Sequence, residues 1–131
     1  MYILVLGDLG VRVVIADDHA WIRQGVRSIF ETRSEWTVCG EAANGQEAID
    51  LVQKLRPELV VLDISMPVMN GLQAAKAIRS ANPETKIVIL SMHDSPHARQ
   101  EALKAGADGY VIKTAEPAEL FETIESLGLK Q

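Results

Sequence analysis

Hydrophobic residues follow two alternating spacings along the chain. Five short apolar runs have the length and composition of β-strands. Between and after them lie segments in which apolar residues recur every three or four positions, as on one face of an α-helix. Strands that alternate with helices predict a parallel sheet covered by helices on both faces. The expected strands are Val11 to Ala16, Trp36 to Ala42, Leu59 to Leu62, Lys86 to Leu90 and Gly109 to Ile112.

The five runs differ in how continuously apolar they are. The third, fourth and fifth contain enough apolar residues in succession to favour central positions in the sheet. The second is polar at Thr37 and Glu41, which predicts an edge strand. The helical spacing before it begins at Trp21, so this tryptophan, like Trp36, is expected to pack against the core.

Residues typical of helix ends separate the expected strands from the expected helices. Asn, Ser and Pro favour the first positions of a helix, and Gly favours the position after its last turn. An N-cap side chain followed three residues later by Glu or Gln also indicates a helix start. The expected starts are Asn44 with Glu47, Asn70, Ser95 with Pro96, and Pro117, and the expected ends are Gly106 and Gly128.

The composition is that of one ordinary globular domain. The chain has 131 residues, of which 47% are hydrophobic and 24% charged, far from the composition of disordered chains. The net charge of -5 is spread along the chain without a lysine and arginine cluster, which argues against direct nucleic-acid binding by this domain. The single cysteine, Cys39, excludes an internal disulfide, fits a reducing compartment and is expected to pack in the core.

The first ten residues, MYILVLGDLG, stand apart from the strand and helix pattern. They are too short to span a membrane and lack the basic region of a signal peptide. We expect an N-terminal extension at 1–10, with an extra edge strand as the alternative, one domain at 11–128 and a tail at 129–131. No linker or output domain is recognisable in this chain, and the expected location is cytoplasmic, without a membrane partner.

Polar residues collect at the carboxyl ends of the expected strands. The first strand is followed by Asp17 and Asp18, the third by Asp63, the fifth by Lys113, and the fourth ends in Ser91. Open α/β sheets bind their ligands at this end. Carboxylates about 4 Å apart repel one another by several kcal/mol at an effective dielectric constant of about 20, so a cation is expected among them. These oxygen donors suit Mg²⁺, and together with the lysine and the hydroxyl they predict a site that a phosphoryl group completes.

Four stretches of the sequence resemble those of a known family. They are ADDH at 16–19, LDISMPVMNG at 62–71, LSMH at 90–93 and GADGYVIK at 106–113. In this order and spacing they are similar to the receiver domain of two-component response regulators. The DDH and LSMH motifs resemble those of the NarL/FixJ subfamily, whose receivers are joined to a LuxR-type DNA-binding domain. The resemblance implies a doubly wound, flavodoxin-like (βα)5 fold of the α/β class, with five parallel strands in the order 2-1-3-4-5 and helices on both faces.

The resemblance also implies a reaction and its metal. Asp63 would be the phospho-acceptor, which takes a phosphoryl group from a phosphohistidine on a partner sensor histidine kinase. Asp17, Asp18 and Asp63 would hold Mg²⁺, together with the main-chain carbonyl of Ser65. The chain would then catalyse only its own phosphorylation and dephosphorylation, so it would not be an enzyme that acts on a separate substrate.

The signal would leave the domain through a switch. Lys113 and Ser91 would bind the phosphoryl oxygens, and the movement of Ser91 would let the ring of Tyr110 turn inward. The surface that changes would be formed by the fourth and fifth helices and the fifth strand, and it would alter a homodimer or contacts with the chain's own or a separate effector domain. That effector would be a DNA-binding output domain.

Two positions beside the expected switch serine modify this expectation. Met92 is bulky where many receivers carry Ala, so it is expected to hinder small phosphodonors more than a kinase. His93, with Ser65, is expected to flank the acceptor and to set the access of water, and therefore the lifetime of the phosphoryl group. His19 is expected to start a helix rather than to bind a ligand.

Other functions fit the residues less well. A dehalogenase-like phosphatase would need an acid at the position of Ser65, and a flavodoxin-like nucleotide binder would need a neutral, anion-attracting loop instead of ADDH. A catalytic triad of Ser91, His93 and Asp94 is disfavoured because neighbours at one strand end rarely reach one another in series. A receiver that is not phosphorylated and acts as an interaction module is the main alternative.

Overall fold

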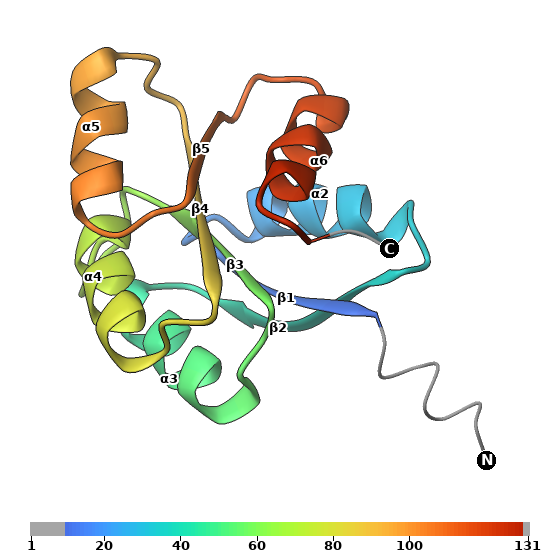
Figure 1. Ribbon diagram of the computed structural model, residues 1–131, viewed down its shortest axis with the longest axis horizontal. Coiled ribbons are helices and arrows are strands. Elements are labelled where there is room, and N and C mark those ends of the chain that lie inside the picture. The colour runs from blue at the N-terminus through green and yellow to red at the C-terminus, as the bar shows by residue number, and fades with distance from the viewer. Residues whose placement is uncertain (1–9, 130–131) are drawn as a thin grey trace.

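The computed structural model describes residues 10–129 and consists of one sheet with helices on both faces (Figure 1). The five strands are all parallel and lie in the order β2-β1-β3-β4-β5, which confirms the expected topology. In chain order the elements are β1 (Val11–Ala16), α2 (Ala20–Glu31), β2 (Trp36–Ala42), α3 (Gly45–Leu55), β3 (Leu59–Asp63), α4 (Gly71–Ala81), β4 (Lys86–Ser91), α5 (Pro96–Lys104), β5 (Gly109–Ile112) and α6 (Pro117–Ser126).

The two faces of the sheet bury separate apolar cores. Helices α3, α4 and α5 cover one face, where Val14, Val60 and Ile89 point, and helices α2 and α6 cover the other, where Val13 and Val61 point (Figure 1). Neighbouring residues of one strand therefore belong to different cores, as the two-residue repeat of a strand requires. This arrangement leaves the carboxyl ends of the inner strands open for a site.

The apolar runs taken alone misplaced one strand, whereas the strand order implied by the family resemblance was correct. Strand β5 lies at the edge of the sheet, and β1 lies inside it, between β2 and β3. Tyr110 and Val111 of β5 are nevertheless buried, because helices pack on both faces of this edge strand. A continuous apolar run therefore reports that both faces of a strand are covered, and it does not distinguish an edge from the interior of the sheet.

The two tryptophans differ in a way that their spacing did not predict. Trp36 is buried, with its ring 5.3 Å from that of Phe30 and 6.0 Å from that of Phe121. Trp21 is 72% exposed, so the expectation that it packs in the core was wrong. It lies in the first turn of α2, next to Ile22. Ile22, and not Trp21, shares the side of the helix on which Val26 and Phe30 face the sheet.

The helix ends follow their expected residues closely. Asn70 and Gln73 form a reciprocal capping box at the start of α4, with bonds of 2.8 and 3.0 Å. Asn44 caps α3 through the N–H of Glu47, and Ser95 caps α5. Pro117 occupies the first turn of α6, and Gly106 and Gly128 have positive φ after α5 and α6.

Three further expectations concerned Cys39, the two ends of the chain and a membrane-spanning helix. Cys39 is only partly buried, and its Sγ lies 3.5 Å from the carbonyl oxygen of Val13 on the edge of the core. The expected extension at 1–10 and tail at 129–131 lie, apart from Gly10 and Leu129, outside the described residues. Within residues 10–129, no helix has the length and apolar character needed to cross a membrane.

Candidate functional site

Strand β3 delivers Asp63 to the open end of the sheet. All five of its residues are buried, and Asp63 is the last of them, paired with Leu90 of β4. The turn that follows is closed by the N–H of Gly71, which donates to the carbonyl of Ile64 at 2.8 Å. A Cβ at Gly71 would collide with the carbonyl oxygen of Asp63, so glycine at this position lets helix α4 begin directly against the acid.

Lys113 stands between two carboxylates from different strands. Its Nζ lies 2.8 Å from Oδ2 of Asp17 and 3.0 Å from Oδ1 of Asp63. The side chains of Asp17 and Asp63 are buried and that of Lys113 is 10% exposed, and the main-chain N–H of Lys113 donates to the carbonyl of Ser91 at 2.7 Å. The structure thus brings together Asp17, Asp63 and Lys113, which are far apart in sequence, as the strand ends predicted.

The loop after β1 holds a second group of charges. Asp17 accepts the N–H of His19 at 2.9 Å, and Nδ1 of the His19 ring lies 3.3 Å from Oδ1 of Asp17 and 3.2 Å from Oδ1 of Asp18. Asp17, Asp18 and His19 can each bring one ligand atom within 4.8 Å of the others. His19 does start α2, as expected, but its ring turns towards the acids instead of capping the helix. Its position next to the Asp pair is the signal in the sequence that could have placed it in the site.

Burial and neighbouring charges shift the pKa values of Asp63 and Lys113. Burial raises the pKa of Asp63, the nearby charges of Asp17 and Asp18 add to this, and the bond from Lys113 opposes it. Burial is also the largest effect on Lys113 and lowers its pKa, but the hydrogen bonds that it donates to Asp17 and Asp63, together with the attraction of their charges, outweigh burial, so the pKa of Lys113 is raised. Lys113 therefore stays charged, but its one positive charge does not balance the acids around it.

The donor atoms fit a hard divalent cation. Three carboxylates and a single lysine leave an excess of negative charge in a largely buried place. Oxygen donors with unbalanced negative charge are what Mg²⁺ binds in proteins, where it also keeps several waters. The residues present therefore fit the expected metal, and the loop after β1 supplies two of the acids.

A hollow of about 180 Å³ opens beside Asp63. Its wall includes Ser65, which is exposed, and Ser91, which is buried. Met92 also lines it and is 62% exposed. The residues that line it are His19, Ile22, Asp63, Ser65, Ser91, Met92, His93 and Lys113. Most of the site residues expected from the sequence therefore line this one hollow.

Tyr110 lies beneath the loop that follows Ser91. Its hydroxyl donates to the carbonyl oxygen of His93 at 2.6 Å, and its ring is buried beside the guanidinium of Arg99, 4.9 Å from the ring centroid. The hydroxyl of Ser91 accepts the N–H of His93 at 3.1 Å. Tyr110 is thus already turned inward here, and it is tied to the same loop as the serine.

The contacts of Ser91 do not form a catalytic triad. Its hydroxyl meets the main chain of His93, not the imidazole ring, and Asp94 pairs with Arg99 at 3.5 Å. The three residues therefore lack the serial side-chain contacts that a triad requires.

Comparison with known proteins identifies the family. Residues 13–125 match the family described as "Response regulator receiver domain". The chain belongs to the response regulator receiver domain family. This result confirms the expected family and fold, and with them the expected role as a phospho-acceptor switch in signalling.

Individual relatives of this receiver domain include both long and short proteins. It is 38% identical over 112 residues to the nitrate/nitrite response regulator NarL of Escherichia coli, covering 86% of this chain and 52% of that protein. It is 37% identical over 119 residues to the chemotaxis protein CheY of Thermotoga maritima, covering 91% of this chain and 98% of that protein. A LuxR-family response regulator from an Aurantimonas species has a crystal structure that is 36% identical, with a TM-score of 0.86, and the alignment covers 90% of this chain and 84% of that one.

These relatives fix the class of protein to which the receiver domain belongs. NarL and the LuxR-family protein are response regulators, which are signalling proteins and not enzymes that turn over a separate substrate. The chain spans about half the length of the transcriptional regulators that it matches, such as NarL at 52%.

Proposed function

We propose that this receiver domain takes a phosphoryl group from a phosphohistidine of a partner kinase onto Asp63, in a reaction that depends on Mg²⁺. The main support for this proposal is that Lys113 lies between Asp17 and Asp63, beside an open hollow. Histidine kinases are the donors implied by the response regulators that the chain resembles.

Asp63 would act as the nucleophile. One of its oxygens forms a bond to phosphorus while the phosphorus–nitrogen bond of the donor breaks, and the electron pair of that bond leaves with the imidazole, which takes up a proton from water. A bound Mg²⁺ would offset the negative charge of the acids and of the incoming phosphoryl group. We assign its ligands to Asp17, Asp18, Asp63 and the main-chain carbonyl of Ser65.

Lys113 and Ser91 would receive the transferred group. Lys113 remains charged because its pKa is raised, so it can pair with phosphoryl oxygens once Asp63 has reacted. Ser91 lies on the wall of the same hollow and can turn its hydroxyl towards an oxygen of the new group.

The loop of Met92 and His93 would connect the site to the outside. Met92 lines the hollow and is largely exposed, and there it would slow small phosphodonors more than a kinase. His93 would limit the access of water, and so the hydrolysis that ends the signal. Because Ser91 and Tyr110 both bind His93, a shift of Ser91 towards the phosphoryl group would move the same loop.

The output surface would be formed by α5, β5 and α6. Tyr110 lies under it, and Leu103 of α5 is a large apolar side chain exposed on it. We propose that phosphorylation alters a homodimer contact or an effector contact here, and that the effector is a DNA-binding output domain. A receiver domain at 11–128, with 1–10 and 129–131 outside it, and a cytoplasmic location remain predictions.

The acceptor can be tested directly by mass. The protein is incubated with acetyl phosphate and Mg²⁺, and its intact mass is measured beside the Asp63→Asn variant. We expect the mass of one phosphoryl group to be added to the native chain and none to the variant, with binding of beryllium fluoride by the native chain alone. If the native chain gains no mass and binds no beryllium fluoride, the domain is an interaction module and not a phospho-acceptor.

A further inference from the structure

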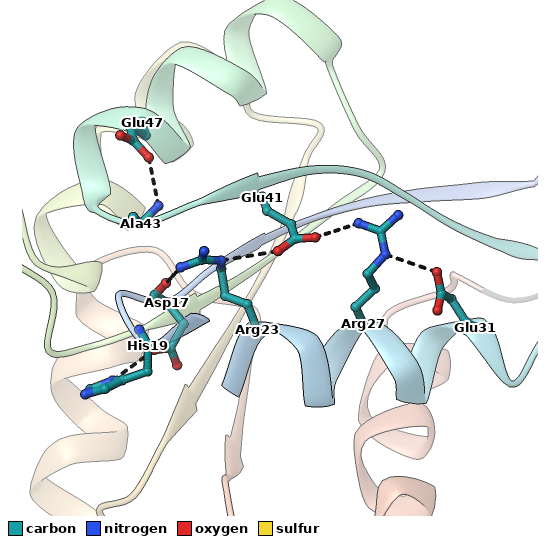
Figure 2. Close-up of polar contacts among 8 residues, drawn as sticks. All are labelled: Asp17, His19, Arg23, Arg27, Glu31, Glu41, Ala43 and Glu47. Carbon is teal, nitrogen blue, oxygen red and sulfur yellow. Dashed lines mark hydrogen bonds and ion pairs between the residues drawn. The ribbon is translucent and has the colours of Figure 1, made fainter. Parts of the chain in front are cut away.

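Two arginines of α2 bind the same glutamate, but only one of them reaches the acidic loop. Nε of Arg23 lies 3.2 Å from Oε1 of Glu41 on β2, and Nη1 of Arg27 lies 2.5 Å from Oε2 of the same side chain (Figure 2). Arg27 also pairs with Glu31 at 3.0 Å. Arg23 has a different second partner, because its Nη1 donates to the main-chain carbonyl of Asp17 at 2.6 Å.

The carbonyl that Arg23 binds belongs to the peptide group between Asp17 and Asp18. A peptide group is planar, so fixing its oxygen fixes the plane from which Asp18 continues. The N–H of Asp17 is held as well, by the carbonyl of Ala42 on β2 at 3.0 Å. Both polar groups of the Asp17 main chain are therefore anchored, one to strand β2 and one to helix α2.

This anchoring sets the directions of two carboxylates. Asp17 is already turned towards Lys113 and His19, whereas the only polar side-chain contact of Asp18 within residues 10–129 is with the half-exposed ring of His19. Asp18 thus depends most on the peptide plane for its orientation. A rigid peptide plane keeps the two acids pointed at one place before a cation arrives, which lowers the entropy lost on binding.

Glu41 keeps the positive charge of Arg23 away from the acids. The guanidinium is occupied by Glu41 on one edge, and the second oxygen of that glutamate pairs with Arg27. The charges of Arg23, Arg27, Glu31 and Glu41 sum to zero, so the network adds no net positive charge beside the carboxylates. Arg23 can therefore hold the loop without competing for the site as a cation.

We propose that Arg23 is a positioning residue for divalent-cation binding by Asp17 and Asp18, with Glu41 as its anchor. This inference rests on the proposed function, because it requires that the acids bind Mg²⁺. Arg23 does not touch the metal or the acceptor in this scheme. It acts through the peptide that joins the two acids.

Arg27 provides a matched control for the experiment. It lies one turn further along α2, and it binds the same Glu41, but its other hydrogen-bond partner is Glu31 and not the loop. Replacing either arginine by glutamine removes one tie between α2 and β2. A purely structural role predicts equal effects of the two changes, whereas positioning predicts that only Arg23→Gln weakens the metal site.

The measurement is Mg²⁺ binding by isothermal titration calorimetry, with melting temperatures of the same samples. We expect Arg23→Gln to weaken Mg²⁺ binding about tenfold or more, the range found when residues that orient metal ligands are replaced. Arg27→Gln should change it by less than about twofold. Arg23→Lys keeps the charge but offers a single donor group, so its affinity should lie between those of the native chain and Arg23→Gln.

The outcomes separate this inference from the proposed function. If the native chain binds Mg²⁺ and both glutamine variants bind it equally well, or equally poorly, the positioning role is overturned and the metal site stands. If the native chain binds no Mg²⁺, both proposals are wrong. Phosphorylation by acetyl phosphate supplies a further test, since Arg23→Gln should reach the native rate at saturating Mg²⁺ but need more Mg²⁺ to do so.

Discussion

The two ends of the sheet hold ion clusters of opposite character. At the amino end, Arg79 pairs with Asp108, and its guanidinium also donates to the carbonyls of Gly106 at 3.0 Å, Pro83 at 2.8 Å and Thr85 at 3.1 Å. The carboxylate of Asp108 in turn accepts the N–H of Ile87 at 2.9 Å. One cation and one anion are thus matched, and nearly every donor has an acceptor.

The carboxyl end lacks this balance. Lys113 there faces Asp17 and Asp63, with Asp18 nearby, so acids outnumber the lysine. A cluster that satisfies itself stabilises the fold, whereas a cluster with excess charge is completed only by a ligand. A structural ion pair is therefore distinguished from a binding site by whether its charges are balanced and hydrogen-bonded within the protein, not by the presence of buried charges.

The largest expected effect comes from breaking the matched cluster. Arg79→Met keeps the aliphatic part of the side chain but leaves Asp108 and several carbonyls without their donor, which should cost about 3 kcal/mol of unfolding free energy. Thermal denaturation should show a melting temperature lower by ~10 °C, with unchanged Mg²⁺ affinity. Lys76→Met, at an exposed position of the same helix, is the control and should change little. An equally stable Arg79→Met would remove the contrast between the two ends.

Completing the unbalanced cluster should have an effect of similar size and opposite sign. Mg²⁺ at one hundred times its dissociation constant should stabilise the native chain by about 2.7 kcal/mol relative to the same protein in EDTA. Asp18→Asn should reduce this gain, whereas Asp108→Asn should preserve it although it weakens the other cluster. Differential scanning calorimetry of the three proteins measures the shift, and an undiminished gain in Asp18→Asn would place the metal elsewhere.

Removing charge from the carboxyl end should stabilise the metal-free protein. The pKa of Asp63 is raised on folding, so stability falls as the pH increases from the usual carboxyl range through this raised pKa. Asp63→Asn avoids that loss, and in EDTA at neutral pH it should raise the melting temperature by about 3 °C. The advantage should shrink on acidification, when Asp63 is protonated in both states. A variant that is less stable at neutral pH would mean that the bond to Lys113 dominates.

The smallest expected effect compares backbone strain at the two ends. Val68, in the turn after Asp63, has φ 67° and is 84% exposed, and Arg56 at the amino end has φ 46°. A β-branched residue is the more strained of the two in the left-handed region, and Asn tolerates it. Val68→Asn should therefore gain roughly 0.5–1 kcal/mol in chemical denaturation, and Arg56→Asn less. A larger gain at Arg56 would contradict this ranking.

Hydrophobic spacing and strand-end chemistry account for most of what the sequence predicted correctly. The strand and helix boundaries follow from local periodicity and from caps such as Asn70, because these depend on neighbouring residues. The site at Asp17, Asp63 and Lys113 followed because the carboxyl ends of parallel strands meet at one edge. The roles assigned to the site residues remain predictions.

The sequence by itself determined the order of elements, their amphipathic faces and the acids at the strand ends, since each is encoded within a few residues. Only the tertiary structure decided that Trp21 faces outward and that His19 turns its ring towards the acids. It alone also joined Arg23 to the carbonyl of Asp17 and to Glu41 of β2. These contacts depend on how helices rotate and pack against the sheet, and that packing is a property of the whole chain.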